Sequence, residues 1–260
     1  MQRNGSFTSR LQKGGALLAD MRQLVTAAAR NPLAAISAEA ARSVLTKVTA
    51  GRLHDVYIRA FKPRFVQGSP PQAWRLAAVL EAQSPDPSVL SSFYYWVTAR
   101  AEPILYDFVT VELFARLTAA DREIRIDEVV AWLKGRLAAA SKSWTPMVQR
   151  KVARGMLAAL RDFGLLEGAV RKRLAAFLLA PEAFALIAFL LHEMGAEAGR
   201  LVDHPDWRLF LLSEAGVEQL FLECHQRHWV RHQVAGAIHR IEFPADTFEE
   251  YAHGVLGRGD

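Results

Sequence analysis

The sequence lacks the features that mark secreted and membrane-spanning proteins. It contains one cysteine, Cys224, so no intrachain disulfide can form, which is typical of a protein in a reducing cytosol. The opening segment, MQRNGSFTSRLQKGG, is polar and basic and has no apolar stretch of the kind found in a secretory signal. The most apolar run, Leu174 to Leu191, carries Pro181 and Glu182 at its centre and is shorter than the about 20 residues that span a bilayer. We therefore expect a cytoplasmic protein without membrane contact.

The sequence also lacks catalytic and phosphate-loop motifs. His192-Glu193 resembles the start of a zinc-protease motif, but residue 196 is Ala where the second His is required. Gly14-Gly15 is not followed by Gly-Lys-Ser/Thr, and no Gly-x-Ser-x-Gly sequence occurs. The carboxylates show no paired arrangement suited to acid–base chemistry. We expect no enzyme, no cofactor and no small-molecule substrate.

One cluster of potential metal ligands occurs near the C-terminal end. The pattern predicts a helix over 217–233, which would place Cys224, His228 and His232 on one face at four-residue intervals. Thiolate and imidazole are the ligands that zinc prefers, but the three turns span about 12 Å of helix axis, too far for one ion to reach all three. A neighbouring pair with a remote ligand such as His204 is the most that could bind an ion. The alternative is a His- and Arg-rich face that is solvated or touches a partner, and we expect no metal.

Composition and periodicity predict an all-α, mainly helical protein of the helical-bundle type with at most a few short strands. Half of the 260 residues are apolar, enough for one large domain or two small ones. We expect an N-terminal helical domain over residues 1–120 and a C-terminal one over 121–260. The segment 53–66 is the exception, because it mixes aromatic and β-branched residues with Pro63, which favours an extended or broken-helix passage.

The stretch from about 127 to 173 has the most informative pattern. Apolar residues from Val129 to Leu137 recur at helical spacing, and a short polar turn follows. Thr145 as N-cap and Pro146 at the first helical position then begin a second helix, which Gly164 ends. A basic segment completes the stretch. Helix, turn, helix and basic return are typical of a helix-turn-helix with a wing; the alternative is a solvated helical hairpin.

The net charge of +5 conceals a strong asymmetry along the chain. Residues 1–75 carry 12 basic and 3 acidic side chains, and residues 141–175 carry 8 and 2. The other two blocks are acidic, with 6 basic and 9 acidic side chains over 76–140 and 6 and 13 over 176–260. Basic blocks favour a polyanionic partner, since Lys and Arg contacts to phosphate supply most non-specific affinity. The alternative is that basic and acidic blocks pair within the fold.

The candidate nucleic-acid-binding residues follow from this pattern. Most would contact backbone phosphates, whereas Gln149 and Arg150, early on the second helix, are placed for base edges. On that second helix and the turn before it we expect Lys142, Gln149, Arg150, Lys151 and Arg154 to lie against a duplex, with Arg171, Lys172 and Arg173 as a wing and with Arg59, Lys62 and Arg64 extending the basic surface.

Several stretches resemble the BrxA family, the small helical component of the bacteriophage exclusion (BREX) defence systems. They are SFTSRLQKGGALLADMRQLV, TPMVQRKVARGMLAALRDFGLL, LAAFLLAPEAFALIAFLLHEMG and the closing IEFP and FEEYAHGVL. The resemblance covers most of the chain except segments such as 51–71. It rests on apolar positions and small motifs, and the family supplies no agreed site residues.

The resemblance implies a cytosolic, mainly helical protein without known catalysis. The family is associated with double-stranded DNA and has been likened to the RNA-binding antitermination protein NusB. It works beside a methyltransferase, an ATPase and a phosphatase-like protein. We therefore expect a non-catalytic, duplex-DNA-binding accessory protein whose partners are DNA and other BREX proteins. The alternatives are a NusB-like RNA-binding protein and a protein–protein scaffold within the defence complex.

Overall fold

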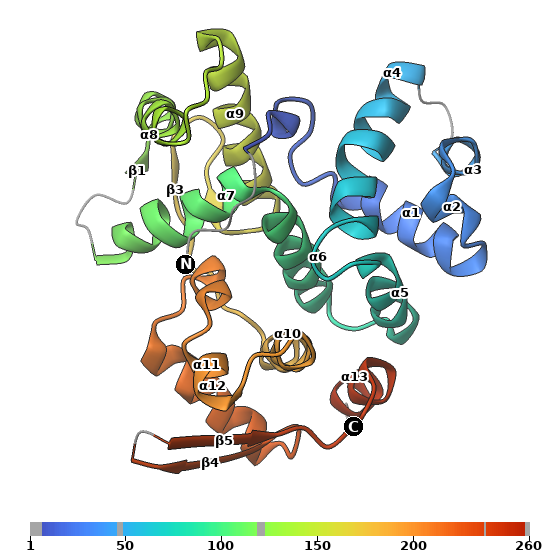
Figure 1. Ribbon diagram of the computed structural model, residues 1–260, viewed down its shortest axis with the longest axis vertical. Coiled ribbons are helices and arrows are strands. Elements are labelled where there is room, and N and C mark those ends of the chain that lie inside the picture. The colour runs from blue at the N-terminus through green and yellow to red at the C-terminus, as the bar shows by residue number, and fades with distance from the viewer. Residues whose placement is uncertain (1–6, 46–48, 119–122, 237, 258–260) are drawn as a thin grey trace. The chain divides into compact units, whose positions relative to one another are not determined.

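A computed structural model of the chain describes residues 7–45, 49–118, 123–236 and 238–257, and within these ranges the protein is mainly helical (Figure 1). The strands of the described residues are short, with two to five residues each. These features confirm the mainly helical fold expected from the sequence. Among the described residues, no helix has both the length and the apolar character needed to cross a membrane.

The contacts between residues divide the chain into two compact units. Unit 1 comprises residues 1–74 and 97–177, and unit 2 comprises residues 75–96 and 178–260. Each unit therefore contains residues from before and after residue 120. The domain boundary at residue 120 stays a prediction.

Unit 1 contains the N-terminal helices and the stretch that the sequence singled out. Its elements are η1 (Arg10–Gln12), α1 (Leu18–Arg30), α2 (Leu33–Ile36), α3 (Ala38–Val44), α4 (Ala50–Leu53), η2 (His54–Val66), α7 (Pro103–Asp107), η3 (Phe108–Leu113), η4 (Arg116–Thr118), β1 (Glu123–Ile124), α8 (Ile126–Ala139), α9 (Pro146–Asp162), β2 (Leu166–Glu167) and β3 (Lys172–Leu174).

The expectation for residues 53–66 is wrong, because this segment is helical. Element η2 is a wide π-type helix with Pro63 inside it. Tyr57, Phe61 and Phe65 are buried on one face, and successive rings stack with centroids 6.0 and 5.7 Å apart. Aromatic residues four positions apart meet on a helix, and burial of these rings outweighs the hydrogen bond that the proline cannot donate.

Side-chain caps begin two of the helices. The Ser37 hydroxyl accepts a hydrogen bond from the Ala40 amide (3.3 Å) and so caps the first turn of α3, which ends at Val44. The Thr247 hydroxyl caps α13 (Phe248–Leu256) in the same way, by accepting from the Glu250 amide (3.3 Å).

Unit 2 is built around α10, in which every residue from Ala183 to Leu191 is buried. Helices α12 and α13 pack against it. Trp96 Nε1 donates to Asp206 Oδ2 (2.8 Å), and both side chains are buried. The elements of unit 2 are α5 (Ala73–Gln83, which begins in unit 1 and enters unit 2 at Arg75), α6 (Pro87–Ala101, which continues into unit 1 from Val97), α10 (Pro181–Glu193), α11 (Ala198–Val202), η5 (Pro205–Phe210), α12 (Glu214–Gln226), β4 (Arg231–Ala235), β5 (Ile238–Glu242) and α13 (Phe248–Leu256).

The expected helix over 217–233 is wrong beyond residue 226. Helix α12 ends at Gln226, and His228 adopts a left-handed conformation with φ of 60°. The chain then enters β4, which pairs antiparallel with β5. Burial of Trp229 and Val230 accompanies this turn. Cys224, His228 and His232 consequently do not share one helical face.

Candidate nucleic-acid interface

Helices α8 and α9 are joined as the sequence predicts. Thr145 Oγ1 accepts a hydrogen bond from the Val148 amide (3.4 Å), and Pro146 is the first helical residue of α9. The apolar stripe of α9, which includes Val152 and Met156, is buried, and α9 packs against α8. Burial of one stripe fixes which face of α9 remains at the surface.

A short β-hairpin follows α9 and is completed by a strand from in front of α8. Strand β3 pairs antiparallel with β2 on one side and with β1 on the other, so the strand order is β1-β3-β2. The hairpin turn requires glycine, because Gly168 has φ of 90° and an added Cβ would lie 2.0 Å from the Arg171 carbonyl oxygen. Gly164 also has a positive φ, of 85°, as expected of a residue that ends α9.

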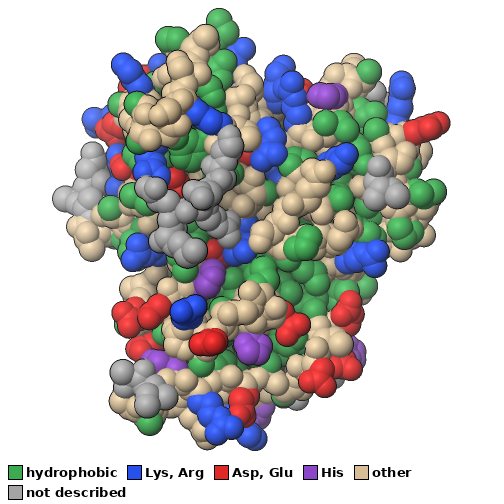
Figure 2. All heavy atoms as spheres, viewed as in Figure 1, with side chains coloured by type: hydrophobic (Ala, Val, Ile, Leu, Met, Phe, Trp, Pro, Cys, Tyr) green, Lys and Arg blue, Asp and Glu red, His purple; other side chains and the backbone are tan. Residues whose placement is uncertain are grey.

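The exposed face of α9 is cationic. Met147, Arg150, Lys151 and Arg154 are all exposed and recur at three- and four-residue intervals. In Figure 2, Lys and Arg side chains are spread over the upper half of the view, including the surface around α8 and α9, where acidic side chains lie among them. Arg150 Nη1 donates to Asp127 Oδ1 (2.8 Å), and the two side chains are 47% and 79% exposed. The structure thus brings three of the predicted residues together on one solvent-facing surface.

Two further predicted residues near α9 are used within the protein. Gln149 Nε2 donates to the Trp144 carbonyl oxygen (2.8 Å), and Lys142 Nζ donates to the Phe7 carbonyl oxygen (2.8 Å). Both residues are only partly exposed. They hold the turn before α9 and the N-terminal segment, and neither is presented as freely as Arg150.

The hairpin carries the basic residues that were expected to form a wing. Arg171 is exposed, Lys172 Nζ donates to the Ala169 carbonyl oxygen (2.8 Å), and Arg173 Nε pairs with Glu167 Oε1 (2.6 Å). Val170, in the turn, is 95% exposed. An aliphatic side chain so exposed at a loop tip has no packing role in the described residues.

A cavity of about 560 Å³ lies between the start of α8, α9 and the hairpin. Its floor is apolar, with side chains such as Ile124 and Leu157. Four cations and two carboxylates line it, namely Arg125, Arg154, Arg171, Lys172, Glu123 and Asp127. The surplus of cations makes this hollow a favourable place for an anion.

The residues predicted on η2 are placed differently from one another. Arg59 pairs with Asp55 one turn away (3.5 Å), and Lys62 is partly exposed. Arg64 is fully buried, and its Nε pairs with Glu102 Oε1 (3.3 Å). Burial lowers the pKa of the Arg64 guanidinium, and the charge of Glu102 opposes that shift. Arg64 has no exposed atom that could contact a phosphate, so its prediction as a nucleic-acid-binding residue is wrong.

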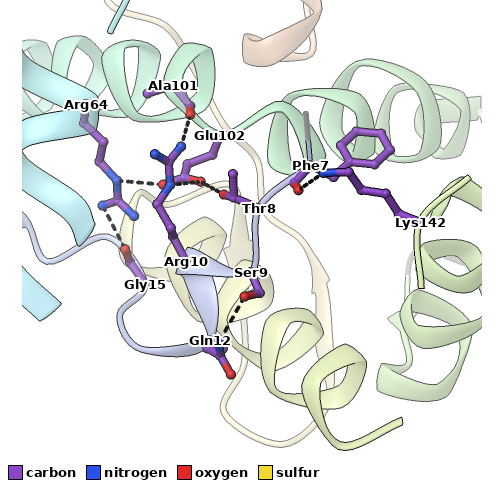
Figure 3. A network of polar contacts seen from close by, with 10 residues as sticks. All are labelled: Phe7, Thr8, Ser9, Arg10, Gln12, Gly15, Arg64, Ala101, Glu102 and Lys142. Atoms are coloured by element: carbon purple, nitrogen blue, oxygen red, sulfur yellow. Dashed lines mark hydrogen bonds and ion pairs between the residues drawn. The ribbon is translucent and has the colours of Figure 1, made fainter. Parts of the chain in front are cut away.

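Buried Glu102 ties the N-terminal segment to the rest of unit 1 (Figure 3). Besides Arg64, Arg10 Nε lies 3.4 Å from Glu102 Oε2, and Arg10 Nη2 donates to the Ala101 carbonyl oxygen (2.8 Å). Arg64 Nη1 in turn donates to the carbonyl oxygens of Gly15 and Ala16. This network fixes the segment that contains η1, and η1 packs on α9.

The close approach of η1 to α9 depends on a glycine. A Cβ added at Gly155 would lie 1.9 Å from the Leu11 carbonyl oxygen, whereas one added at Gly135 on α8 would meet nothing within 4 Å. We expect Gly155→Ala to lower the free energy of unfolding by about 1–3 kcal/mol, because the overpacked backbone must shift. Gly135→Ala, the matched control, should raise it by about 0.5–1 kcal/mol through helix propensity. Urea unfolding followed by circular dichroism measures both, and equal effects of the two variants would refute the close approach.

The described residues offer little for metal or nucleophilic chemistry. No group of three or more His, Cys, Asp and Glu side chains within the described ranges is arranged to hold a metal ion. Cys224 is buried, and burial raises the pKa of its thiol to about 12. His232 Nε2 lies 3.2 Å from His239 Nδ1 across the β4–β5 hairpin. The pKa of His232 is lowered by burial and by that neighbour.

We expect Cys224 to be inert in the folded protein. A thiol with so high a pKa supplies almost no thiolate near pH 7, and burial blocks reagents. Native protein should leave a thiol-specific reagent unreacted, whereas protein in urea should consume one equivalent. A Val234→Cys variant, at an exposed position of the same unit, should react rapidly when native. Native wild-type labelling at the Val234→Cys rate would contradict the burial of Cys224.

Sequence reasoning missed four residues that the structure adds to this surface. Arg125 and Asp127 line the cavity, Met147 shares the exposed face of α9, and Val170 stands in the hairpin turn. Met147 could have been placed on the exposed face of α9 from the sequence, because it precedes Arg150 and Lys151 by three and four residues. No sequence pattern indicates that Asp127 pairs with Arg150, because the two residues are 23 positions apart.

One of three comparisons with known proteins gives a match, and that match covers most of the chain. The BrxA family model matches residues 5–190. No curated protein and no solved structure gives a significant match.

Proposed function

The chain belongs to the BrxA family of BREX phage-defence components, and on that premise we propose that it is a non-catalytic cytoplasmic accessory protein that binds double-stranded DNA. The interface consists of α9 and the β2–β3 hairpin of unit 1. Its partners are duplex DNA and other proteins of the defence system. No small-molecule substrate or cofactor enters this function.

The observation that carries the proposal is the order β1–α8–α9–β2–β3 with β1 paired to β3. A helix-turn-helix with a wing has this order, with a short connection between two helices and a hairpin after the second; here residues 140–145 connect α8 to α9. In such units the second helix enters the major groove and its N-terminal residues face the base edges. Helix α9 occupies that place in the order, and its N-terminal half carries three exposed cations, Arg150, Lys151 and Arg154.

Charge supports the same assignment. Lys151 and Arg154 are exposed and not engaged by any carboxylate among the described residues, and Arg171 adds a third cation from the hairpin. The surplus of cations around the adjoining cavity suits a backbone phosphate. Phosphate contacts fix the register of a protein on a duplex without reading its sequence. We therefore assign most of the affinity to these residues.

The other predicted residues have smaller parts in the proposal. Lys172 and Arg173 lie on β3 and reach phosphates only by leaving Ala169 and Glu167. Arg59 and Lys62 stay predictions as an extension of the surface. Arg64 is left out because it is buried.

Fluorescence anisotropy of a labelled duplex, titrated at several salt concentrations, tests the proposal. Three phosphate contacts, by Lys151, Arg154 and Arg171, give a slope of about −2.7 for log affinity against log salt, and two further contacts by Lys172 and Arg173 would steepen it to about −4.5. A matched RNA hairpin, competed against the duplex, separates DNA binding from the NusB-like alternative. Preference for the hairpin would move the function to RNA, and absence of binding to either at low salt would favour the scaffold.

A further inference from the structure

We propose that Arg150 reads a guanine in the major groove and that Asp127 holds its guanidinium in position to do so. The inference rests on the proposed duplex binding and adds to it a base that the protein recognises. It also assigns a specificity role to an acidic residue on a mainly cationic surface.

The geometry of the pair suits this role. Arg150 is the fifth residue of α9, within the N-terminal part of a second helix that faces base edges. Its Nη1 donates a hydrogen bond to Asp127 Oδ1 (2.8 Å), and the guanidinium has no other acceptor among the described residues. Guanine presents O6 and N7 as two adjacent acceptors in the major groove, and a guanidinium can donate to both at once.

Asp127 limits the positions that Arg150 can take. A free arginine side chain has many rotamers, and fixing it costs conformational entropy on binding. A carboxylate within hydrogen-bond distance removes part of that cost before the duplex arrives. The neighbouring residues cannot replace Arg150, since Gln149 is bonded to the Trp144 carbonyl oxygen and Lys151 carries a point charge without a planar fork.

Asp127 also works against binding that is not sequence-specific. Its carboxylate is 79% exposed and lines the cavity beside Arg125, Arg154 and Arg171. A negative charge there repels phosphate, so it lowers affinity for every duplex. An ordinary surface ion pair would change the affinity for all duplexes by the same factor. A guanine-reading pair changes the affinity for duplexes according to their guanines.

The experiment uses the full chain and a chemical change in the base. Duplexes of 20 base pairs are selected from a random pool for binding, and the tightest is remade with 7-deazaguanine in place of guanine. This replacement keeps the Watson–Crick pairs and removes the N7 acceptor. Affinities for both duplexes and for the unselected pool are measured for the wild type, Arg150→Ala and Asp127→Asn. The matched control is Arg161→Ala, an exposed arginine of the same helix that pairs with Asp162.

We expect the wild type and Arg161→Ala to bind the 7-deazaguanine duplex about tenfold more weakly than the guanine duplex. Arg150→Ala, which has no donor left for N7, should show less than a twofold difference between the two duplexes. Asp127→Asn should bind the unselected pool more tightly and discriminate less. Equal wild-type affinity for the two duplexes would overturn the guanine assignment while leaving duplex binding intact. Undiminished discrimination in Asp127→Asn would overturn the role of the carboxylate, and failure of the wild type to bind any duplex would overturn the proposed function itself.

Discussion

Reversing the charge of three cations on α9 should reduce duplex affinity by at least about 100-fold. The triple variant Arg150→Glu, Lys151→Glu and Arg154→Glu removes three contacts to phosphate or base and adds three repulsive charges at the same surface. The three side chains are exposed on one helical face. The Arg150–Asp127 ion pair lies at the surface and contributes about 0–1 kcal/mol to stability. The urea midpoint of the variant should therefore stay close to that of the wild type.

A matched control separates local contact from general charge. Arg22, Arg30 and Arg42 are exposed cations of α1 and α3 in the same unit. Replacing all three with Glu makes the same change in net charge away from α9 and the hairpin. At physiological salt, charges beyond about 8 Å are largely screened, so this control should lose only a few-fold in affinity. Equal losses in the two triple variants would argue against α9 as the binding helix.

Replacing Glu102 should have the largest effect on stability. Its carboxylate is fully buried between Arg64, also fully buried, and the partly exposed Arg10. Glu102→Ala leaves a buried guanidinium without its counter-charge, and loss of one member of a buried ion pair costs about 3–5 kcal/mol. The N-terminal segment should also loosen, since Thr8 and Arg10 both contact Glu102.

The measurement is the urea midpoint by circular dichroism, with Glu39→Gln as control. Glu39 is an exposed carboxylate in the first turn of α3, and its loss should cost less than about 1 kcal/mol. A Glu102→Ala variant as stable as Glu39→Gln would show that the buried ion pair does not hold unit 1 together.

Local chemistry explains which parts of the fold the sequence could predict. Thr145-Pro146 and Gly164 bound α9 through their own backbone preferences, so both ends of that helix were readable. Strand β1 was not, because two residues gain their conformation only from pairing with β3, about 50 positions later. For the same reason, Pro63 argued against a helix whose aromatic face the tertiary core stabilises.

For the candidate site too, local sequence patterns predicted the helix face, and contacts between distant residues could not be predicted. The period of α9 placed Arg150, Lys151 and Arg154 on one face, as the structure has them. Arg64 was misassigned because its partner lies 38 positions away and no local signal marks a buried cation. Gln149 and Lys142 bond to carbonyl oxygens, which a pattern of side-chain types cannot reveal. The match of the BrxA family model to residues 5–190 confirms the family. It gives the biological setting but identifies no binding residue.

Crosslinking from the hairpin tests the proposed interface most directly. Cys224 is buried, so a cysteine introduced at Val170 can carry a single photoreactive group through a maleimide. Val234→Cys, at an exposed site in unit 2, carries the same group as control. With bound duplex, irradiation should join Val170→Cys protein to DNA and leave Val234→Cys protein largely uncrosslinked. Crosslinks from position 234 without crosslinks from position 170 would contradict binding through α9 and the hairpin.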